Sequence, residues 1–338
     1  MIFNDALKAA AARDKLRLHT PGHKGALCAL DITELTDDAF PYPALNAAQS
    51  RAASVYGAKH ARYLSGGSSQ GVKSALRYCD CDGIADVNSH RAVFDGFGLA
   101  GKKCITTGER GGVRPITVKD IDKALSTAAK AVAVTSPTYY GYCADVDGIK
   151  EYCRRKGLLF VCDGAHGAHF GFGDRLPESA VPIADICNVS THKTLSALTQ
   201  TALIFDNLTD ADSDRLSQAV DVMGTTSPSY ILYASIESAV EKAASAETRR
   251  RYNALYDPLT SLKKHLPFLN NDDYTRLVLD CAPLGIAPDA LNAALIRRGV
   301  YSERVDARYI IFIFTAENTP SDAEALSAAL EQSIAELK

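Results

Sequence analysis

Four segments of the sequence carry side chains whose types and spacing could do chemistry. The apolar run LLFVCD ends in Asp163 and continues to His166. The run ADICNVS leads into Lys193, and GIADVN leads into His90. The fourth segment, SGGSSQG at residues 65–71, combines glycines and hydroxyls in the manner of a helix start. Because open α/β sheets bind ligands at the carboxyl ends of their strands, we expect these side chains to lie close together.

An acid, a lysine, a histidine and a helix start rich in glycine and serine are the parts needed to hold pyridoxal phosphate (PLP). Lys193 can form the Schiff base with the cofactor, and Asp163 can keep the pyridine nitrogen protonated. A carboxylate a few ångströms from that cation contributes about 4 kcal/mol at an effective dielectric constant near 20. His90 can lie flat against the ring. Backbone N–H groups at a helix start can bind the phosphate, and the candidates are Gly67, Ser68 and Ser69.

The elements that must position these residues alternate between strands and helices. The predicted strands are 83–88, 131–137, 158–163, 184–190 and 202–206, and helical patterns such as 146–156 separate several of them. This alternation predicts a mostly parallel sheet with helices on both faces. After about residue 235 the pattern changes to a long helical stretch, short strands and further helices, at 235–256, 277–280, 288–298, 309–315 and 321–337. We therefore predict a large PLP-binding domain over 1–235, with an N-terminal helix and loop, and a small α+β domain over 236–338.

The composition excludes several classes of protein. A length of 338 residues suggests about two domains, and 46% hydrophobic with 23% charged residues is typical of a globular protein. The net charge of −3 gives no basic field for nucleic acid or an anionic membrane. The apolar runs are far shorter than the roughly 20 residues of a membrane span, and the N-terminus lacks the order of a signal peptide. Nine cysteines without a CxxC pair indicate reduced thiols, so we expect a cytoplasmic protein.

Six motifs occur in an order typical of one family. They are RLHTPGHKG, YLSGGSSQG, SPTYYG, CDGAHGAHF, STHKTLSALTQ and TSPSYILYAS. Together they resemble the major domain of the Orn/Lys/Arg decarboxylases, which are PLP enzymes of fold type I (the aspartate-aminotransferase fold). The resemblance covers about 16–235 and extends more faintly over 273–318. It implies a three-layer large domain with a mostly parallel sheet, a smaller α+β C-terminal domain, and decarboxylation of lysine, ornithine or arginine to an amine and CO2.

The resemblance assigns roles to individual residues. It makes Lys193 the lysine bound to the cofactor, Asp163 the partner of the pyridine nitrogen, and His90 the residue stacked on the ring. His166 would lie beside the phenolic oxygen of the cofactor or beside the substrate, and it is a candidate for protonation at Cα. The phosphate neighbours that the family implies are Ser68, Ser69, Ser190 and His192.

The resemblance also implies residues for the substrate and for a partner subunit. Arg308 is the candidate for the substrate carboxylate and Glu303 for the distal cation, and surface salt bridges are the alternative for both. His23 lies in a loop that the family places near the active site, although a purely structural loop is the other interpretation. In a homodimer with the cofactor site at its interface, Thr226 and Ser227 are expected to reach the cofactor of the partner subunit.

The sequence departs from the family pattern in places. Arg91-Ala92 stands where the family has Lys-Ser after the stacking histidine, and Gly164 stands where it has an acid. Long family members carry an extra N-terminal domain and a larger C-terminal domain that this sequence lacks, so we do not expect their higher assemblies.

Other functions remain open from the residues alone. The same PLP-binding residues serve other reactions at Cα, so an aminotransferase or a lyase is the alternative function. A non-catalytic PLP-binding paralogue is a third hypothesis. A metal site is the alternative for Asp163, His166 and His169, and also for Cys79 and Cys81. We favour no metal, because strand-end geometry would splay the first set of side chains and a lone CxC is a weak signal.

Overall fold

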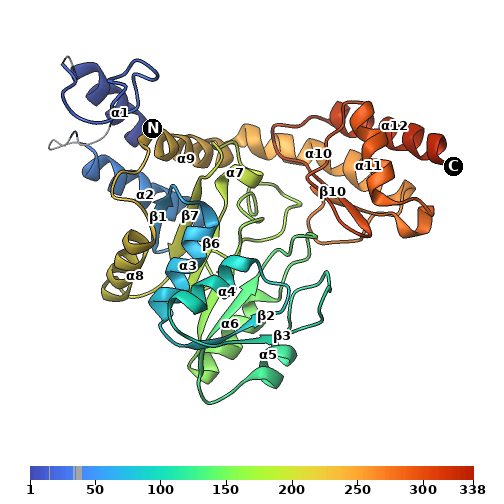
Figure 1. Cartoon of the computed structure of the whole chain (residues 1–338), viewed down its shortest axis with the longest axis horizontal. Coiled ribbons are helices and arrows are strands. Elements are labelled where there is room, and N and C mark those ends of the chain that lie inside the picture. Colours follow the sequence, from blue (N-terminus) through green and yellow to red (C-terminus); the bar gives the residue numbers. More distant parts are fainter. Residues whose placement is uncertain (15, 33–34, 36–39) are drawn as a thin grey trace. The chain divides into compact units, whose positions relative to one another are not determined.

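The computed structural model describes residues 1–14, 16–32, 35 and 40–338, which form two compact units (Figure 1). The first unit contains residues 1–137, 144–168 and 179–242. The second unit contains residues 138–143, 169–178 and 243–338. The division into a large PLP-binding domain over 1–235 and a small α+β domain over 236–338 stays a prediction.

The first unit is built on a seven-stranded sheet in the order β1-β7-β6-β5-β4-β2-β3. The strand bounds are β1 His60–Leu64, β2 Asp82–Asp86, β3 Cys104–Thr107, β4 Ala129–Thr135, β5 Leu159–Asp163, β6 Ile186–Val189 and β7 Ala202–Asp206. β7 is antiparallel to β1 and β6, and the other neighbouring pairs are parallel. The prediction of an α/β protein with a mostly parallel sheet is therefore confirmed.

The two edge strands, β1 and β3, are missing from the strands expected from sequence. β1 carries His60 and Arg62, and no residue of β3 is fully buried. By contrast, β5 and β7 are buried almost throughout, as strands covered on both faces require. Continuous apolar runs identify central strands, whereas half-solvated edge strands lack this signal.

Helices connect and cover the strands of the first unit. Their bounds are α1 Ile2–Arg13, α2 Tyr42–Tyr56, α3 Gly67–Cys79, α4 Arg91–Leu99, α5 Val118–Ala124, α6 Val146–Lys156, α7 Thr191–Thr194, α8 Asp210–Met223 and α9 Tyr230–Ala243. α3 packs between α4 and α8 and contacts β1, β5, β6 and β7. A Cβ at position 71 of α3 would lie 2.9 Å from Leu64 Cδ1, so glycine there lets the helix approach the sheet closely. Through α3, the glycine- and serine-rich segment is held against the central strands.

The second unit contains a three-stranded antiparallel sheet in the order β8-β10-β9, with helices around it. The bounds are α10 Ala246–His265, β8 Arg276–Asp280, a 3-10 turn Ala282–Leu284, α11 Pro288–Arg297, β9 Arg304–Val305, β10 Tyr309–Ile313 and α12 Pro320–Leu337. Apolar side chains of α10, α11, α12, β8 and β10 form its core. The single helix predicted over 235–256 is wrong, because the chain breaks between α9 and α10. Ser245 caps α10 there by accepting the N–H of Thr248 at 3.2 Å.

A buried polar cluster lies inside the second unit and holds its segment 169–178. His169 and Asp273 are fully buried, and His169 Nε2 lies 3.3 Å from Asp273 Oδ2. Thr275 donates its hydroxyl to Asp273 Oδ1 at 2.6 Å. Burial by itself would raise the pKa of Asp273, but His169 and the buried Arg276 hold it well below its usual range. The ionised carboxylate therefore stabilises the folded second unit.

Asp273→Asn is expected to lower the free energy of unfolding by about 3 kcal/mol at neutral pH, because it leaves the buried guanidinium of Arg276 without its anion. A carboxyl whose pKa is depressed on folding contributes stability above its unfolded pKa of 3.8, and this contribution is lost as pH falls through the lower folded value. The difference between wild type and variant should therefore shrink below about pH 4. Denaturant unfolding at pH 7 and pH 3 measures this stability difference, and substitution of the exposed neighbouring residue, Asp272→Asn, is the control. Equal losses at both pH values would contradict the ion-pair argument.

The structure bears on the expectations about metal sites and membrane spans. Among the residues that the structure describes, no group of three or more His, Cys, Asp or Glu side chains could hold a metal ion, so the metal alternatives gain no support. All nine cysteines are free thiols. Within the described part of the chain, no helix combines the length and apolar character needed to cross a membrane.

Candidate active site

Asp163 ends β5, and two N–H donors hold its carboxylate. Asn188 lies at the paired position on β6 and donates from Nδ2 to Asp163 Oδ1 at 3.0 Å. The backbone N–H of Ala165 reaches the same oxygen at 3.3 Å. The residue is only 5% exposed. Among the described residues both hydrogen bonds go to Oδ1, so Oδ2 can accept from a ligand cation.

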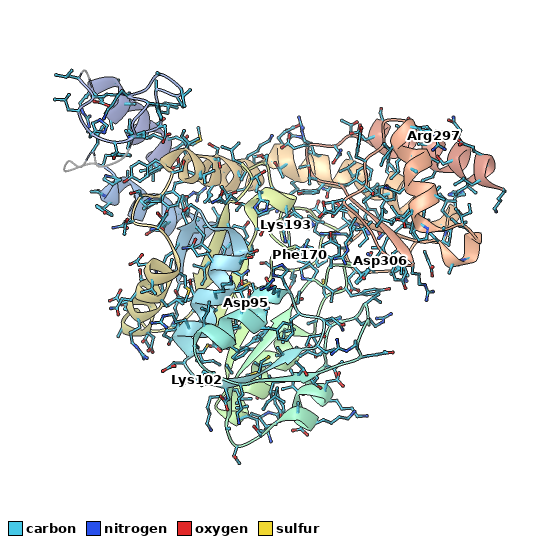
Figure 2. All side chains as sticks on the ribbon, viewed as in Figure 1. Asp95, Lys102, Phe170, Lys193, Arg297 and Asp306 are labelled. Carbon is cyan, nitrogen blue, oxygen red and sulfur yellow. The ribbon has the colours of Figure 1, made fainter. Side chains whose placement is uncertain are left out.

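Lys193 lies on the short helix α7, directly after β6 (Figure 2). Its Nζ lies 3.2 Å from Nε2 of His166, which follows β5. Two contacts with Thr201 hold helix α7 in place. Thr191 donates its hydroxyl to Thr201 Oγ1 at 2.7 Å, and His192 Nδ1 lies 2.8 Å from Thr201 O. The structure thus brings together the predicted lysine and histidine at a distance that allows a proton to pass between them.

The N-terminus of α3 carries the residues predicted to bind the phosphate. Gly67 has φ +70°, a conformation that favours glycine, and a Cβ there would have its nearest neighbour 3.8 Å away at Gln200 O. Ser190 donates its hydroxyl to Ser68 Oγ at 2.9 Å, which joins this helix start to the segment before Lys193. Ser69 is half-buried in the first turn. Backbone N–H groups and clustered hydroxyls at a helix start suit a phosphate dianion.

These groups fit PLP in the arrangement expected from sequence. The hydroxyls and N–H groups at the start of α3 suit its phosphate, the remaining oxygen of Asp163 suits its pyridine nitrogen, and Lys193 supplies an amine. Each of the three lies at the carboxyl end of a strand or directly follows one, so the first unit presents them at one edge of its sheet.

Other predicted cofactor residues have described contacts of their own. His90 is the N-cap of α4, where its Nδ1 accepts the N–H of Ala92 at 3.2 Å, and it is exposed. Thr226 and Ser227 are exposed in the segment between α8 and α9. Their roles toward the cofactor stay predictions.

The three candidate substrate residues each have a protein partner. Arg308 donates from Nε and Nη2 to the two oxygens of Asp280, at 3.0 and 2.6 Å, and these hydrogen bonds hold the pKa of Asp280 below its usual value. Glu303 Oε1 accepts the hydroxyl of Tyr139 at 3.0 Å. Burial, together with Glu303, raises the pKa of Tyr139 to about 12. His23 Nε2 lies 3.0 Å from Asp31 Oδ2.

Asn188 and Tyr139 are the residues that sequence reasoning missed. Asn188 interrupts the apolar run ADICNVS, and a polar residue inside a buried strand was the available signal. Tyr139 lies in the motif SPTYYG, but nothing in the local sequence points to Glu303, 164 residues further along the chain.

Comparison with known proteins identifies the relatives of this chain. The family model described as the Orn/Lys/Arg decarboxylase major domain matches residues 26–281. An arginine decarboxylase of Bacillus cereus is 26% identical over 375 residues, covering 96% of this chain and 80% of the relative. An arginine decarboxylase of Bacillus subtilis is 28% identical, with 96% and 76% covered.

Solved structures agree in fold. Lysine decarboxylase A from Pseudomonas aeruginosa superposes with a TM-score of 0.81 at 19% identity, covering 98% of this chain and 59% of that chain. The chain therefore spans about three fifths of the length of this decarboxylase. A serine palmitoyltransferase from Sphingomonas wittichii gives a TM-score of 0.72 at 16% identity, covering 100% of this chain and 86% of that chain.

The expected fold type and cofactor are confirmed at the level of the family. The solved neighbours are decarboxylases and serine palmitoyltransferases of PLP fold type I, some with PLP bound. The family model covers about three quarters of the sequence, and residues 26–281 include the glycine- and serine-rich segment, the lysine motif and strand β8. The chain belongs to the Orn/Lys/Arg decarboxylase family of PLP-dependent enzymes.

Proposed function

We propose that this chain is a PLP-dependent decarboxylase that acts on a basic amino acid and releases an amine and CO2. The observation that carries the proposal is the contact of 3.2 Å between Lys193 Nζ and His166 Nε2. His166 follows Asp163 on the same segment, and Ser190, just before Lys193, donates its hydroxyl to Ser68 at the start of α3. Decarboxylation requires an electron sink and a proton donor at Cα, and this arrangement supplies groups for both.

Each group of the chain has a defined task in the proposed reaction. Pyridoxal phosphate, when bound, supplies the ring that accepts the electron pair left as CO2 departs. Asp163 is the anion that balances the pyridine cation, and the two donors on Oδ1 fix its orientation. The start of α3 anchors the phosphate through N–H groups and Ser68. Lys193 Nζ and His166 Nε2 share the proton that is delivered to Cα of the substrate.

The substrate is proposed as lysine, ornithine or arginine. Support comes from the family description and from relatives named arginine decarboxylase and solved neighbours named lysine decarboxylase. Asp280 occupies two of the five N–H donors of Arg308, so three remain for another acceptor. The roles of Arg308, Glu303 and His23 toward the substrate stay predictions.

We also propose a homodimer in which Thr226 of one protomer lies near the cofactor of the other. The exposure of the segment between α8 and α9 supports this proposal, because Thr226 and Ser227 are accessible to a second copy. Sedimentation at micromolar concentration is expected to give a dimer. A monomer that retains its cofactor would contradict the proposal.

The experiment that tests the function is CO2 release from purified protein supplied with PLP, against a panel of amino acids. Release from one basic amino acid, absent in the Lys193→Ala protein, is the expected result. If PLP binds but no amino acid yields CO2, the decarboxylase proposal is overturned. Assays for keto acids and ammonia then test the aminotransferase and lyase alternatives.

A further inference from the structure

We propose that Asn188 is a positioning residue for Asp163 and that it ties this acid to the phosphate-binding helix α3. The inference rests on the proposed function only in that Asp163 serves the cofactor. It concerns a residue on β6, whose side chain lies between β5 and α3.

The hydrogen bond between the two side chains has a defined polarity. Asn188 Nδ2 lies 3.0 Å from Asp163 Oδ1, and Asn188 is 1% exposed. An ionised carboxylate only accepts hydrogen bonds, so the amide must present its nitrogen to it. With the N–H of Ala165 on the same oxygen, the carboxylate cannot rotate without losing a buried bond. Oδ1 is therefore occupied by the protein, and Oδ2 is presented for the cofactor.

The backbone of Asn188 holds the next residue of the β5 segment as well. Its carbonyl oxygen accepts the N–H of Gly164 at 2.9 Å. A Cβ at position 164 would lie 3.0 Å from that oxygen and 3.3 Å from Cys187 Sγ. Glycine at this position, where the family has an acid, thus allows β6 to approach the chain directly after Asp163.

On its other side Asn188 meets the helix that starts the phosphate cradle. A Cβ at position 71 would lie 3.0 Å from Asn188 Cβ, so α3 reaches this side chain only because residue 71 is glycine. One side chain therefore contacts both the acid for the pyridine nitrogen and the helix for the phosphate.

Stability by itself does not explain an amide at position 188. Among the described residues Asn188 Oδ1 is buried without a hydrogen-bond partner, and a buried polar atom of that kind costs stability. The residues on either side in β6 are apolar and buried. An apolar side chain would suit the strand, so the benefit of the amide lies in its bond to Asp163.

The test compares Asn188→Leu and Asn188→Asp with a matched control, Asn207→Leu. Asn207 donates its amide to the backbone oxygens of Val181 and Ala184 at 2.9 and 2.8 Å, which is a purely structural use of the same group. Three quantities are measured for each protein. They are the thermal midpoint without cofactor, the PLP dissociation constant, and the visible absorbance maximum of the bound cofactor.

We expect Asn188→Leu to weaken PLP binding roughly tenfold or more and to shift the absorbance maximum, while the thermal midpoint without cofactor falls by no more than it does in Asn207→Leu. Asn188→Asp, which faces Asp163 with a second acceptor, should weaken PLP binding further. Asn207→Leu should lower the thermal midpoint and change the PLP dissociation constant by less than about twofold. PLP binding and absorbance at wild-type values in a folded Asn188→Leu or Asn188→Asp protein would overturn the inference.

These measurements separate failure of the inference from failure of the proposed function, because none of them requires turnover. A wild-type protein that binds PLP but releases no CO2 overturns the decarboxylase proposal, and the comparison at position 188 still gives its answer. A wild-type protein that does not bind PLP overturns both.

Discussion

Lys193→Ala is expected to lower the rate of CO2 release at least about a thousandfold and to remove the visible absorbance of bound PLP. In the proposed mechanism two functions are lost together, the amine that attaches the cofactor and one of the two groups that share the proton for Cα. The geometry supports these two roles, because Lys193 Nζ lies 3.2 Å from His166 Nε2 and helix α7 is anchored by the hydrogen bond of Thr191 to Thr201. Single-turnover CO2 release and the absorbance spectrum measure the two effects separately.

Two variants sharpen the result. Lys193→Arg keeps a positive charge but cannot provide a neutral amine, so it should be as inactive as the alanine variant. Lys102→Ala removes an outlying lysine whose ion pair with Asp80 spans 3.3 Å, and it should leave rate and spectrum unchanged (Figure 2). Activity in Lys193→Arg within about tenfold of wild type would exclude the proposed role of the amine.

Asp163→Asn is expected to have the second large effect, a loss of about a thousandfold in the rate of CO2 release. The substitution keeps the shape of the side chain and an oxygen that can accept from Asn188 and Ala165, but it removes the negative charge. A charge a few ångströms from the pyridine cation is worth about 4 kcal/mol at an effective dielectric constant near 20, which corresponds to about a thousandfold in rate. Asp163→Ala should lose at least as much.

The rate measurement needs a matched acid as control. Asp95 forms surface ion pairs with Lys73 and Arg91, at 3.7 and 3.4 Å, and such pairs contribute little to stability. Asp95→Asn should therefore behave as wild type. Turnover at the wild-type rate in Asp163→Asn would show that charge at this position is not needed.

Much of the fold follows from local patterns. The central strands β4, β5, β6 and β7 are mostly apolar and buried, and such runs predict strands covered by helices on both faces. The edge strands lack this signal. The break between α9 and α10 is not evident from the sequence, because the residues around Ser245 are good helix formers and a serine, although favoured at an N-cap, also occurs inside helices.

The chemistry at the strand ends is equally local. Asp163, His166 and Lys193 stand directly after their strands, so strand assignment and residue type together were enough to nominate them. Their catalytic roles are part of the proposed function, and the contact between Lys193 and His166 supports them.

The sequence by itself determined the fold class, the family and the candidates for cofactor chemistry, because short motifs and apolar runs carry all three. Only the tertiary structure decided which side chains meet. The pair Asp163 and Asn188 depends on the register between β5 and β6, and the pair Arg308 and Asp280 depends on the register between β8 and the chain before β10. Register between strands arises from packing of residues distant in sequence, so no local pattern could reveal these partners.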